Sequence, residues 1–501
     1  MSSEHDNTPV QQANDGASEQ HVSAQALVDE GEAWEEGKDR AVDEQKAFEL
    51  YREAAQMGHA RGWLKLGRCY YWGTGVEKDC AKAFDCFMKA DPDADPIAQY
   101  YLGLCYEFGN GVERNHVKAL NWYMKCALSG DRDGQFKVGY LYEMGDESVR
   151  DETKCVQWYE RAAEAGEDTA QNNLAGMYLD GRLVPRDVGK AIELFEKSAE
   201  AGCASAQLNL GLIYYNGDDV PADLAKAVRY WKLAAEAGLD DAQNDLGHCY
   251  LDGEGVEQDY AEAKRLFELA AEQGNGFAFH ALGTMYADGT GVAKDTARAI
   301  DYYQKALEAG NSFGALSIAR MYDNGAGVPQ DASKAFPYYL EAARQGHATA
   351  QYRVGTLYRD GVGTEVDEGE AYRWFAKAAE QENLGAICAM FNHCLGQEPH
   401  DMNGAFRYAM QGANQLEPYC LTFAGMILVR DDDPKRIRVG FEMLLEAARA
   451  GNRDAQRDLG RCYTLGIGTQ ADVEQGMQWT IKAAEQGDKE AIELLNQCRV
   501  D

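Results

Sequence analysis

The sequence lacks any apolar run that approaches the roughly 18 residues of a membrane-spanning helix, and it lacks the basic start and apolar core of a secretory signal. Positive charge is also scarce: 49 Lys and Arg face 83 Asp and Glu, which leaves a formal net charge of −34. Such a surface repels phosphate backbones and anionic lipids. We therefore expect a cytoplasmic chain with no nucleic-acid partner and no membrane insertion, whose protein partners are basic or neutral.

Motifs of catalysis are missing as well. The sequence contains no phosphate-binding loop of the G-x-x-x-x-G-K-[ST] kind, no H-E-x-x-H helix and no recognisable Ser-His-Asp set. The 13 cysteines are an odd number in a chain without an export signal, which argues against a disulfide scaffold. Four of them, Cys69, Cys105, Cys249 and Cys462, each directly precede a tyrosine in a sequence pattern that recurs along the chain, and the other occurrences of the pattern have Leu, Ile or Met there. We expect buried, reduced thiols, no cofactor and no enzymatic activity.

A regular spacing of glycines is what the sequence does contain. Consecutive anchors lie 36 residues apart, or a multiple of 36, at Gly67, Gly103, Gly139, Gly211, Gly247, Gly283 and Gly355. Ala175 and Ala319 fill the two missing positions, Phe391 continues the count, and Ala424 and Gly460 follow at 33 and 36 residues. Counting backwards reaches Gly31. The period predicts one array of about thirteen repeats that grows by stacking copies.

Each copy is predicted to be a helix, a turn and a second helix. Between residues 242 and 274, apolar side chains recur at helical spacing up to Tyr250, and Gly253 then opens a glycine-rich turn. Val256 is expected to plug the space between the helices, and Asp259 to cap the second helix. The anchor glycines and the paired alanines of the second helix would let neighbouring helices lie close together.

These residues and this period resemble the Sel-1-like repeat family, relatives of the tetratricopeptide repeats, over residues 24–501. The resemblance implies an all-α fold, a right-handed α-solenoid of about thirteen 36-residue helix-turn-helix repeats, whose concave face binds other proteins. It also implies a scaffold or adaptor rather than an enzyme. Residues 1–23 are expected to form a disordered acidic and polar tail, because they offer almost no large apolar side chain. A C-terminal capping helix is expected at about 488–498.

Two irregular repeats occupy about 381–440, where the Gly-x-Gly-Val turn and the anchor tyrosine are lost. A Cys/His group falls here, at Cys388, His393, Cys394, His400 and Cys420. The six-residue step from Cys388 to Cys394 does not match the close pair of a zinc site, so no metal is expected. A metal- or thiol-dependent activity at residues 388–420 remains an alternative function, as does an exported effector that interacts with host proteins. Pro337 is expected to kink the second helix of its repeat or to lie near its first turn.

The candidate binding residues are those that the helical repeat places opposite the inward-facing stripe of each first helix. Aromatic, amide and basic side chains gather at these positions, which suits a peptide segment better than a small molecule. Packing against the neighbouring helix is the alternative interpretation. The predicted concave-face residues are Arg68, Tyr71, Tyr100, Tyr140, Asn172, Asn244, His248, His280, Arg320 and Tyr352.

Overall fold

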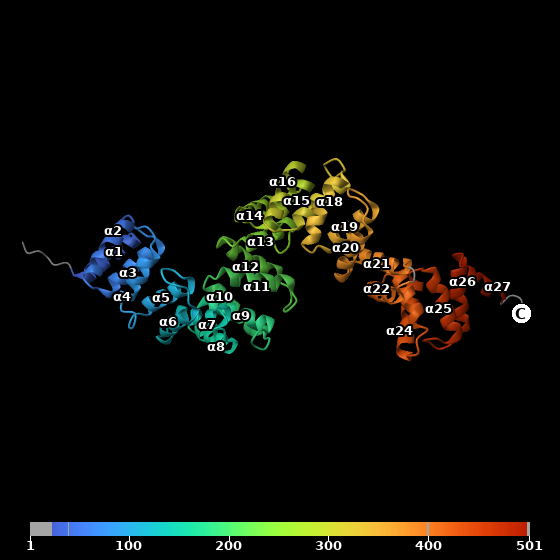
Figure 1. Cartoon of the computed structure of the whole chain (residues 1–501), viewed down its shortest axis with the longest axis horizontal. Helices are drawn as coiled ribbons and strands as arrows, with labels where there is room; N and C mark the ends of the chain where they lie inside the picture. The colour runs from blue at the N-terminus through green and yellow to red at the C-terminus, as the bar shows by residue number, and fades with distance from the viewer. Residues whose placement is uncertain (1–22, 39, 398–399, 498–501) are drawn as a thin grey trace, which may run out of the picture. The chain divides into compact units, whose positions relative to one another are not determined.

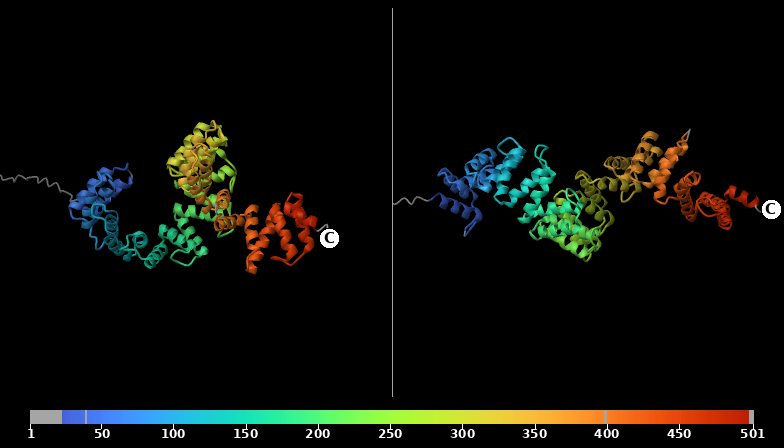
Figure 2. Two further views of the ribbon diagram at one scale, coloured as in Figure 1. Left: turned by 45° about the vertical axis from the view of Figure 1, so that its right-hand side comes forward. Right: turned by 90° about the horizontal axis from the view of Figure 1, so that it is seen from below.

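The computed structural model describes residues 23–38, 40–397 and 400–497, and every regular element in this part of the chain is an α-helix (Figure 1). Residue contacts divide the chain into Met1–Ala242 and Gln243–Asp501, which we call the N-terminal and C-terminal halves. Within each half, antiparallel helix pairs stack one after another (Figure 2). The predicted all-α solenoid is confirmed. The expectation of a disordered tail concerns residues 1–22 almost entirely, and these lie outside the described residues.

Thirteen helix pairs, which we number as repeats 1 to 13, account for helices α1 to α26, so the predicted count is confirmed for the described chain. The first helix of each pair is helix A and the second is helix B. The A helices are α1 (Ala24–Glu36), α3 (Ala60–Trp72), α5 (Pro96–Phe108), α7 (Arg132–Met144), α9 (Asp168–Asp180), α11 (Ala204–Asn216), α13 (Asp240–Asp252), α15 (Gly276–Asp288), α17 (Phe313–Asn324), α19 (Ala348–Asp360), α21 (Leu384–Gly396), α23 (Pro418–Leu428) and α25 (Arg453–Leu465).

The B helices are α2 (Glu44–Gln56), α4 (Cys80–Lys89), α6 (His116–Leu128), α8 (Glu152–Glu164), α10 (Val188–Glu200), α12 (Leu224–Glu236), α14 (Tyr260–Glu272), α16 (Thr296–Glu308), α18 (Ala332–Arg344), α20 (Glu368–Glu380), α22 (Met402–Asn414), α24 (Pro434–Arg449) and α26 (Val473–Glu485). A last helix, α27 (Lys489–Gln497), lies within the range predicted for a capping helix.

The turn inside a repeat follows the predicted pattern, as repeat 3 illustrates. Gly109 ends α5 in the left-handed region at φ 75°, where a side chain is disfavoured, and its N–H bonds to the carbonyl of Cys105. Gly111 has φ 78°, and a Cβ there would collide with the carbonyl oxygen of Cys80 in helix B of the preceding repeat. Val112 packs against the core beneath the turn. Asn115 caps α6, because its Oδ1 accepts the N–H of Lys118 at 2.9 Å.

The anchor glycine makes room for a ring of its own helix B. A Cβ at Gly67 would lie 2.6 Å from Cε1 of Phe87, so the ring rests directly on the backbone of α3. The expectation that the anchor brings neighbouring helix backbones together is therefore corrected. Backbones approach at the paired alanines instead, where a Cβ at Gly62 would lie 2.8 Å from the amide nitrogen of Ala55. The same ring contact holds for Gly31 with Tyr51, Gly103 with Tyr123, Gly139 with Tyr159, Gly211 with Trp231, Gly247 with Phe267, Gly283 with Tyr303, and Gly355 with Phe375.

Repeats 11 and 12 alter this arrangement. Phe391 fills the anchor slot of α21, and the ring slot of α22 holds the small Ala409; both side chains are buried in one cluster. In α23 the anchor is Gly425 and not Ala424, because a Cβ at Gly425 would lie 2.9 Å from the Leu444 side chain of α24. The anchors Phe391, Gly425 and Gly460 are thus 34 and 35 residues apart.

Some residues of the C-terminal half adopt conformations that usually require other amino acids. Pro337 lies in the interior of α18 and the helix continues past it, so the kink stays a prediction. Glu382 and Leu416 have φ of 60° and 59° at positions where neighbouring repeats have glycine. A side chain in this left-handed region costs about 1 kcal/mol, so both repeats carry local strain.

Candidate functional site

The predicted concave-face residues lie on A helices, but they differ in how far a partner could reach them. Tyr71 and Asn244 are buried, with 5% and 8% of their surface exposed, whereas His248 and Arg320 are exposed. The remaining candidates are partly buried: Arg68, Tyr100, Tyr140, Asn172, His280 and Tyr352.

Several of these side chains already contact a neighbouring repeat. Asn110 donates its amide N–H to the hydroxyl oxygen of Tyr71 at 2.9 Å. Asn209 donates to Oδ1 of Asn172 at 3.1 Å, and Nε2 of His280 lies 3.0 Å from the Ser317 hydroxyl. These three candidate residues therefore already take part in contacts between repeats.

Buried carboxylates next to the same face are occupied within the fold. Tyr123 of α6 donates its hydroxyl to Glu107 at the end of α5, and Lys137 of α7 lies 3.2 Å from the same carboxylate. The three groups tie both helices of repeat 3 to helix A of repeat 4. Burial raises the pKa of Tyr123 well above its usual value, and the nearby Glu107 charge and hydrogen bond raise it further.

A carboxylate accepts the tyrosine hydroxyl in three further repeats with a tyrosine in the ring slot, whereas the hydroxyl of Tyr303 lies 3.3 Å from that of Thr284. Asp323, Tyr339 and Arg353 join α17, α18 and α19, with Arg353 donating to both carboxylate oxygens at 2.9 Å. Burial alone would raise the pKa of Asp323, but hydrogen bonds from Arg353 and Tyr339 outweigh it and lower the pKa. Sequence reasoning missed these networks, although the acid and the tyrosine are always 16 residues apart: Glu35 with Tyr51, Glu107 with Tyr123, Glu143 with Tyr159, and Asp323 with Tyr339.

An exposed apolar row, Trp72, Phe108 and Met144, runs along the N-terminal half. Each residue is the last of its A helix, in α3, α5 and α7, and 60%, 59% and 59% of their surfaces are exposed. Repeats 5 to 10 place a polar residue at this position, namely Asp180, Asn216, Asp252, Asp288, Asn324 and Asp360, whereas repeat 13 has Leu465. Large apolar side chains here are therefore not a requirement of the fold.

The surroundings of the apolar row combine rings with paired charges. The Trp72 ring packs edge-on against Tyr71 with 4.9 Å between centroids. Nζ of Lys137 lies 5.6 Å from the Phe108 ring while it also pairs with Glu107. Two predicted residues belong to the same helix faces, since Arg68 precedes Trp72 by four residues and Tyr140 precedes Met144 by four. The three apolar residues are 36 residues apart in the sequence, but only the observed helix ends show that each is the last residue of its A helix.

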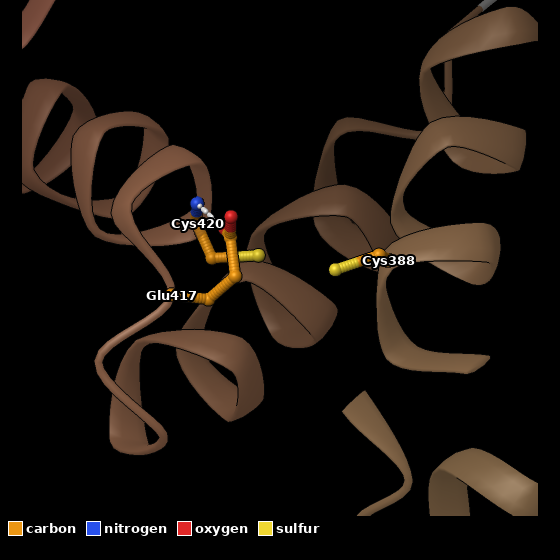
Figure 3. Close-up of side chains that lie close together, drawn as sticks. All are labelled: Cys388, Glu417 and Cys420. Carbon is orange, nitrogen blue, oxygen red and sulfur yellow. Dashed lines mark hydrogen bonds between the residues drawn. The ribbon is translucent and has the colours of Figure 1, made fainter. Parts of the chain in front are cut away.

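A second candidate site is a cluster in the irregular repeats, formed by Cys388, Glu417 and Cys420 (Figure 3). One ligand atom from each residue lies within 4.8 Å of the others, and this is the one such group of metal-ligating side chains found in the described residues. Cys388 is on α21, Cys420 is on α23, and Glu417 caps α23.

The rest of the predicted Cys/His group does not join this cluster. His393 stacks on Tyr372 with 3.6 Å between ring centroids, and Nδ1 of His400 lies 2.7 Å from the carbonyl oxygen of Gln397. Cys394 is buried near the start of α22, where it faces Gly404. Sequence reasoning compared Cys388 with Cys394, whereas the fold places Cys388 beside Cys420, 32 residues further on.

These features define an α-solenoid of tetratricopeptide-like helix pairs with surfaces displayed on its A helices. A search of its helices shows none in the described residues that is long and apolar enough to cross a membrane. The Sel1 repeat model matches residues 31–59, 64–90, 96–131, 132–167, 168–203, 204–239, 240–275, 278–311, 313–347, 348–383 and 453–488. The chain therefore belongs to the Sel1 repeat family. The matched segments leave out 384–452, which holds α21 to α24 and the cysteine cluster.

Two solved structures illustrate the relationship. The chain is 31% identical to c5321, a protective antigen of uropathogenic Escherichia coli strains with an SLR fold; the match covers 87% of this chain and 86% of that one, with a TM-score of 0.58. It is 29% identical to a Sel1 repeat protein from Oxalobacter formigenes, over 76% of this chain and 95% of that one, with a TM-score of 0.47. The first of these comparisons agrees with the repeat architecture described above.

Proposed function

We propose that the protein is a non-enzymatic interaction scaffold that binds an apolar segment of a partner protein along the apolar row of α3, α5 and α7. Fold and family support a binding role in general, because Sel1 and tetratricopeptide-like repeats are typical of interaction scaffolds. The row supplies the particular surface and the chemistry of the partner.

The observation that carries the proposal is the difference between repeats. Six other repeats place Asp or Asn where the row has Trp72, Phe108 and Met144, and they form the same helix pair. Exposed apolar area is unfavourable in water, at roughly 25 cal/mol per Å². Trp and other aromatic side chains also contribute much of the energy at protein interfaces. Three consecutive exposures of this kind mark a docking surface more readily than a folding requirement.

The proposed partner segment has apolar anchors and a basic or neutral remainder. Lys137 beside the row is already neutralised by Glu107, and the chain as a whole carries a net charge of −34. An acidic segment would be repelled, whereas a basic one would associate faster at low salt. Arg68 and Tyr140 extend the surface along the same helix faces, and the remaining predicted face residues stay candidates for further contacts.

The test compares the wild type with a triple variant, Trp72→Asp, Phe108→Asn and Met144→Asp, which introduces residues that the other repeats use at this position. Leu465→Asp in α25 is the matched control, because Leu465 is 64% exposed at the equivalent position of repeat 13. Proximity labelling in the native host identifies partners lost from the triple variant and kept by the control. Calorimetry with the purified partner and each variant then measures affinity.

The expected result is a loss of affinity of at least about 100-fold in the triple variant, since each anchor contributes about 1–2 kcal/mol. Equal affinity of the triple variant and the wild type for every recovered partner would overturn the proposed surface. The proposal places the protein in the cytoplasm, and recovery outside the cell on fractionation would favour the exported effector instead.

A further inference from the structure

We propose that Cys388, Cys420 and Glu417 bind a thiophilic divalent metal ion of the zinc class, which joins helix A of repeat 11 to helix A of repeat 12. The proposal is independent of the apolar row, because the two sites lie in different halves of the chain. It assigns a role to repeats that depart from the Sel1 pattern.

The geometry is close to that of a bound ion. The two sulfurs point toward each other from α21 and α23, and the Glu417 carboxylate lies beside Cys420 (Figure 3). All three ligand atoms lie within 4.8 Å of one another. Tetrahedral zinc with bonds of about 2.3 Å to sulfur holds two sulfurs about 3.8 Å apart. Side-chain movements that shift the ligand atoms by about an ångström would therefore give the separations of a bound zinc ion.

The two cysteines occupy slots that do not require a thiol. Cys420 is at the position that most other repeats fill with Ala, as Ala98 and Ala350 illustrate. Cys388 takes the face position that holds Asn172 and Asn244 in other repeats. The regular repeats have no cysteine at either position. The two cysteines therefore occur together only in repeats 11 and 12, where the fold places their sulfurs side by side.

Glu417 supplies the proposed third ligand and also caps the N-terminus of α23. One of its oxygens, Oε2, accepts the backbone N–H of Cys420 at 2.6 Å and caps α23. A carboxylate oxygen of Glu417 also lies within 4.8 Å of both sulfurs. A cap that is fixed in this way holds the carboxylate in place before the ion arrives, which lowers the entropy cost of binding.

Charge explains why a cation suits the site. A divalent ion replaces both thiol protons, which leave as two H⁺, and forms two metal–thiolate bonds. With the carboxylate the site then carries a net charge of −1, and a water completes four ligands.

The test is a cobalt titration of the full-length reduced protein, followed by displacement with zinc. Cobalt bound by thiolates gives an intense sulfur-to-metal charge-transfer absorption that carboxylate sites lack. The variants are Cys420→Ala and Cys388→Asn, which use residues natural to those slots, and Glu417→Asn, which keeps a capping side chain. Cys462→Leu is the control, because its slot holds leucine in other repeats.

The expected result is one cobalt per chain with charge-transfer absorption, displaced by zinc. Both cysteine variants should lose this absorption, Glu417→Asn should bind about 10- to 100-fold more weakly, and Cys462→Leu should match the wild type. Circular dichroism verifies that each variant is folded. Two results would overturn the proposal: binding that both cysteine variants retain, or a folded, reduced wild type that binds no cobalt and forms a Cys388–Cys420 disulfide with hydrogen peroxide.

Discussion

Repeat 11 reverses the pairing of a small anchor with a large ring, and this reversal can be tested by exchange. Phe391 and Ala409 are 1% and 0% exposed. The Phe391 ring lies 4.9 Å from the ring of Phe423, much as the Phe87 ring of repeat 2 lies 4.8 Å from Tyr101 at the equivalent position. One ring therefore fills the same space from either helix. We expect Phe391→Gly and Ala409→Phe together to restore the pairing of the other repeats.

The magnitudes follow from burial. Phe391→Gly removes a buried ring, at about 3–5 kcal/mol, and places glycine in a helix, at about 1 kcal/mol. Ala409→Phe alone forces a second ring into filled space, at about 1–3 kcal/mol. In the double variant the ring returns to the core and only the glycine cost of about 1 kcal/mol remains. The two changes should therefore couple favourably by about 4–8 kcal/mol.

The assay must be local, because a long array does not unfold as one two-state unit. Hydrogen–deuterium exchange of peptides from α21 and α22 reports the free energy of opening of this repeat. Ala405→Phe, at another fully buried position of α22, is the control, and Phe391→Gly should not rescue it. If the losses from Phe391→Gly and Ala409→Phe add within about 0.5 kcal/mol, the idea of one shared ring position is refuted.

Three further outcomes follow from the structure. Leu416→Gly should stabilise the end of repeat 11 by up to about 1 kcal/mol, measured by hydrogen exchange of α22, because it relieves a left-handed backbone; a destabilised α22 would contradict this. Tyr123→Phe should weaken protection of α5 and α6 by about 1–3 kcal/mol, since Glu107 loses a buried donor, whereas unchanged exchange would show that the bond contributes nothing. Burial, and then the neighbouring His248, lower the pKa of His280 to about 4. The unfolded chain takes up a proton below about pH 6.5 that folded His280 does not, so stability should be level above that pH and fall toward pH 4. His280→Asn should flatten this part of a pH series of unfolding, and an unchanged slope would assign it to other groups.

The helix pairs could be predicted from the sequence because each rule is repeated many times. Caps such as Asp79 and turn glycines such as Gly109 recur at fixed distances, so a chance match in one copy is outweighed by the rest. The anchor glycine was predicted at the right place with an incomplete reason. Only coordinates reveal that Phe87 and its equivalents rest on it.

The sites were harder to predict because they depend on which side chains face across repeats. Glu107 is a carboxylate at a helix end, where exposure is usual, yet it is 4% exposed and accepts a hydrogen bond from Tyr123. Cys388 and Cys420 are separated by a complete helix and two turns, so no short spacing indicates that they meet. In the irregular repeats the anchor itself moved by one residue, to Gly425, and the sequence count alone could not fix that register.

The contact of Gly111 with the carbonyl of Cys80 has a consequence for how such a chain changes length. Each turn is fitted to the helix of the copy before it, so a copy is completed only by its predecessor. Duplicating or deleting one whole period preserves every such junction, whereas losing a single helix leaves a turn with nothing to rest on. A gene for this fold can therefore gain or lose 36 codons at a time with little penalty, while smaller changes in length are confined to places where the junction has been rebuilt, as in the shortened repeats 11 and 12.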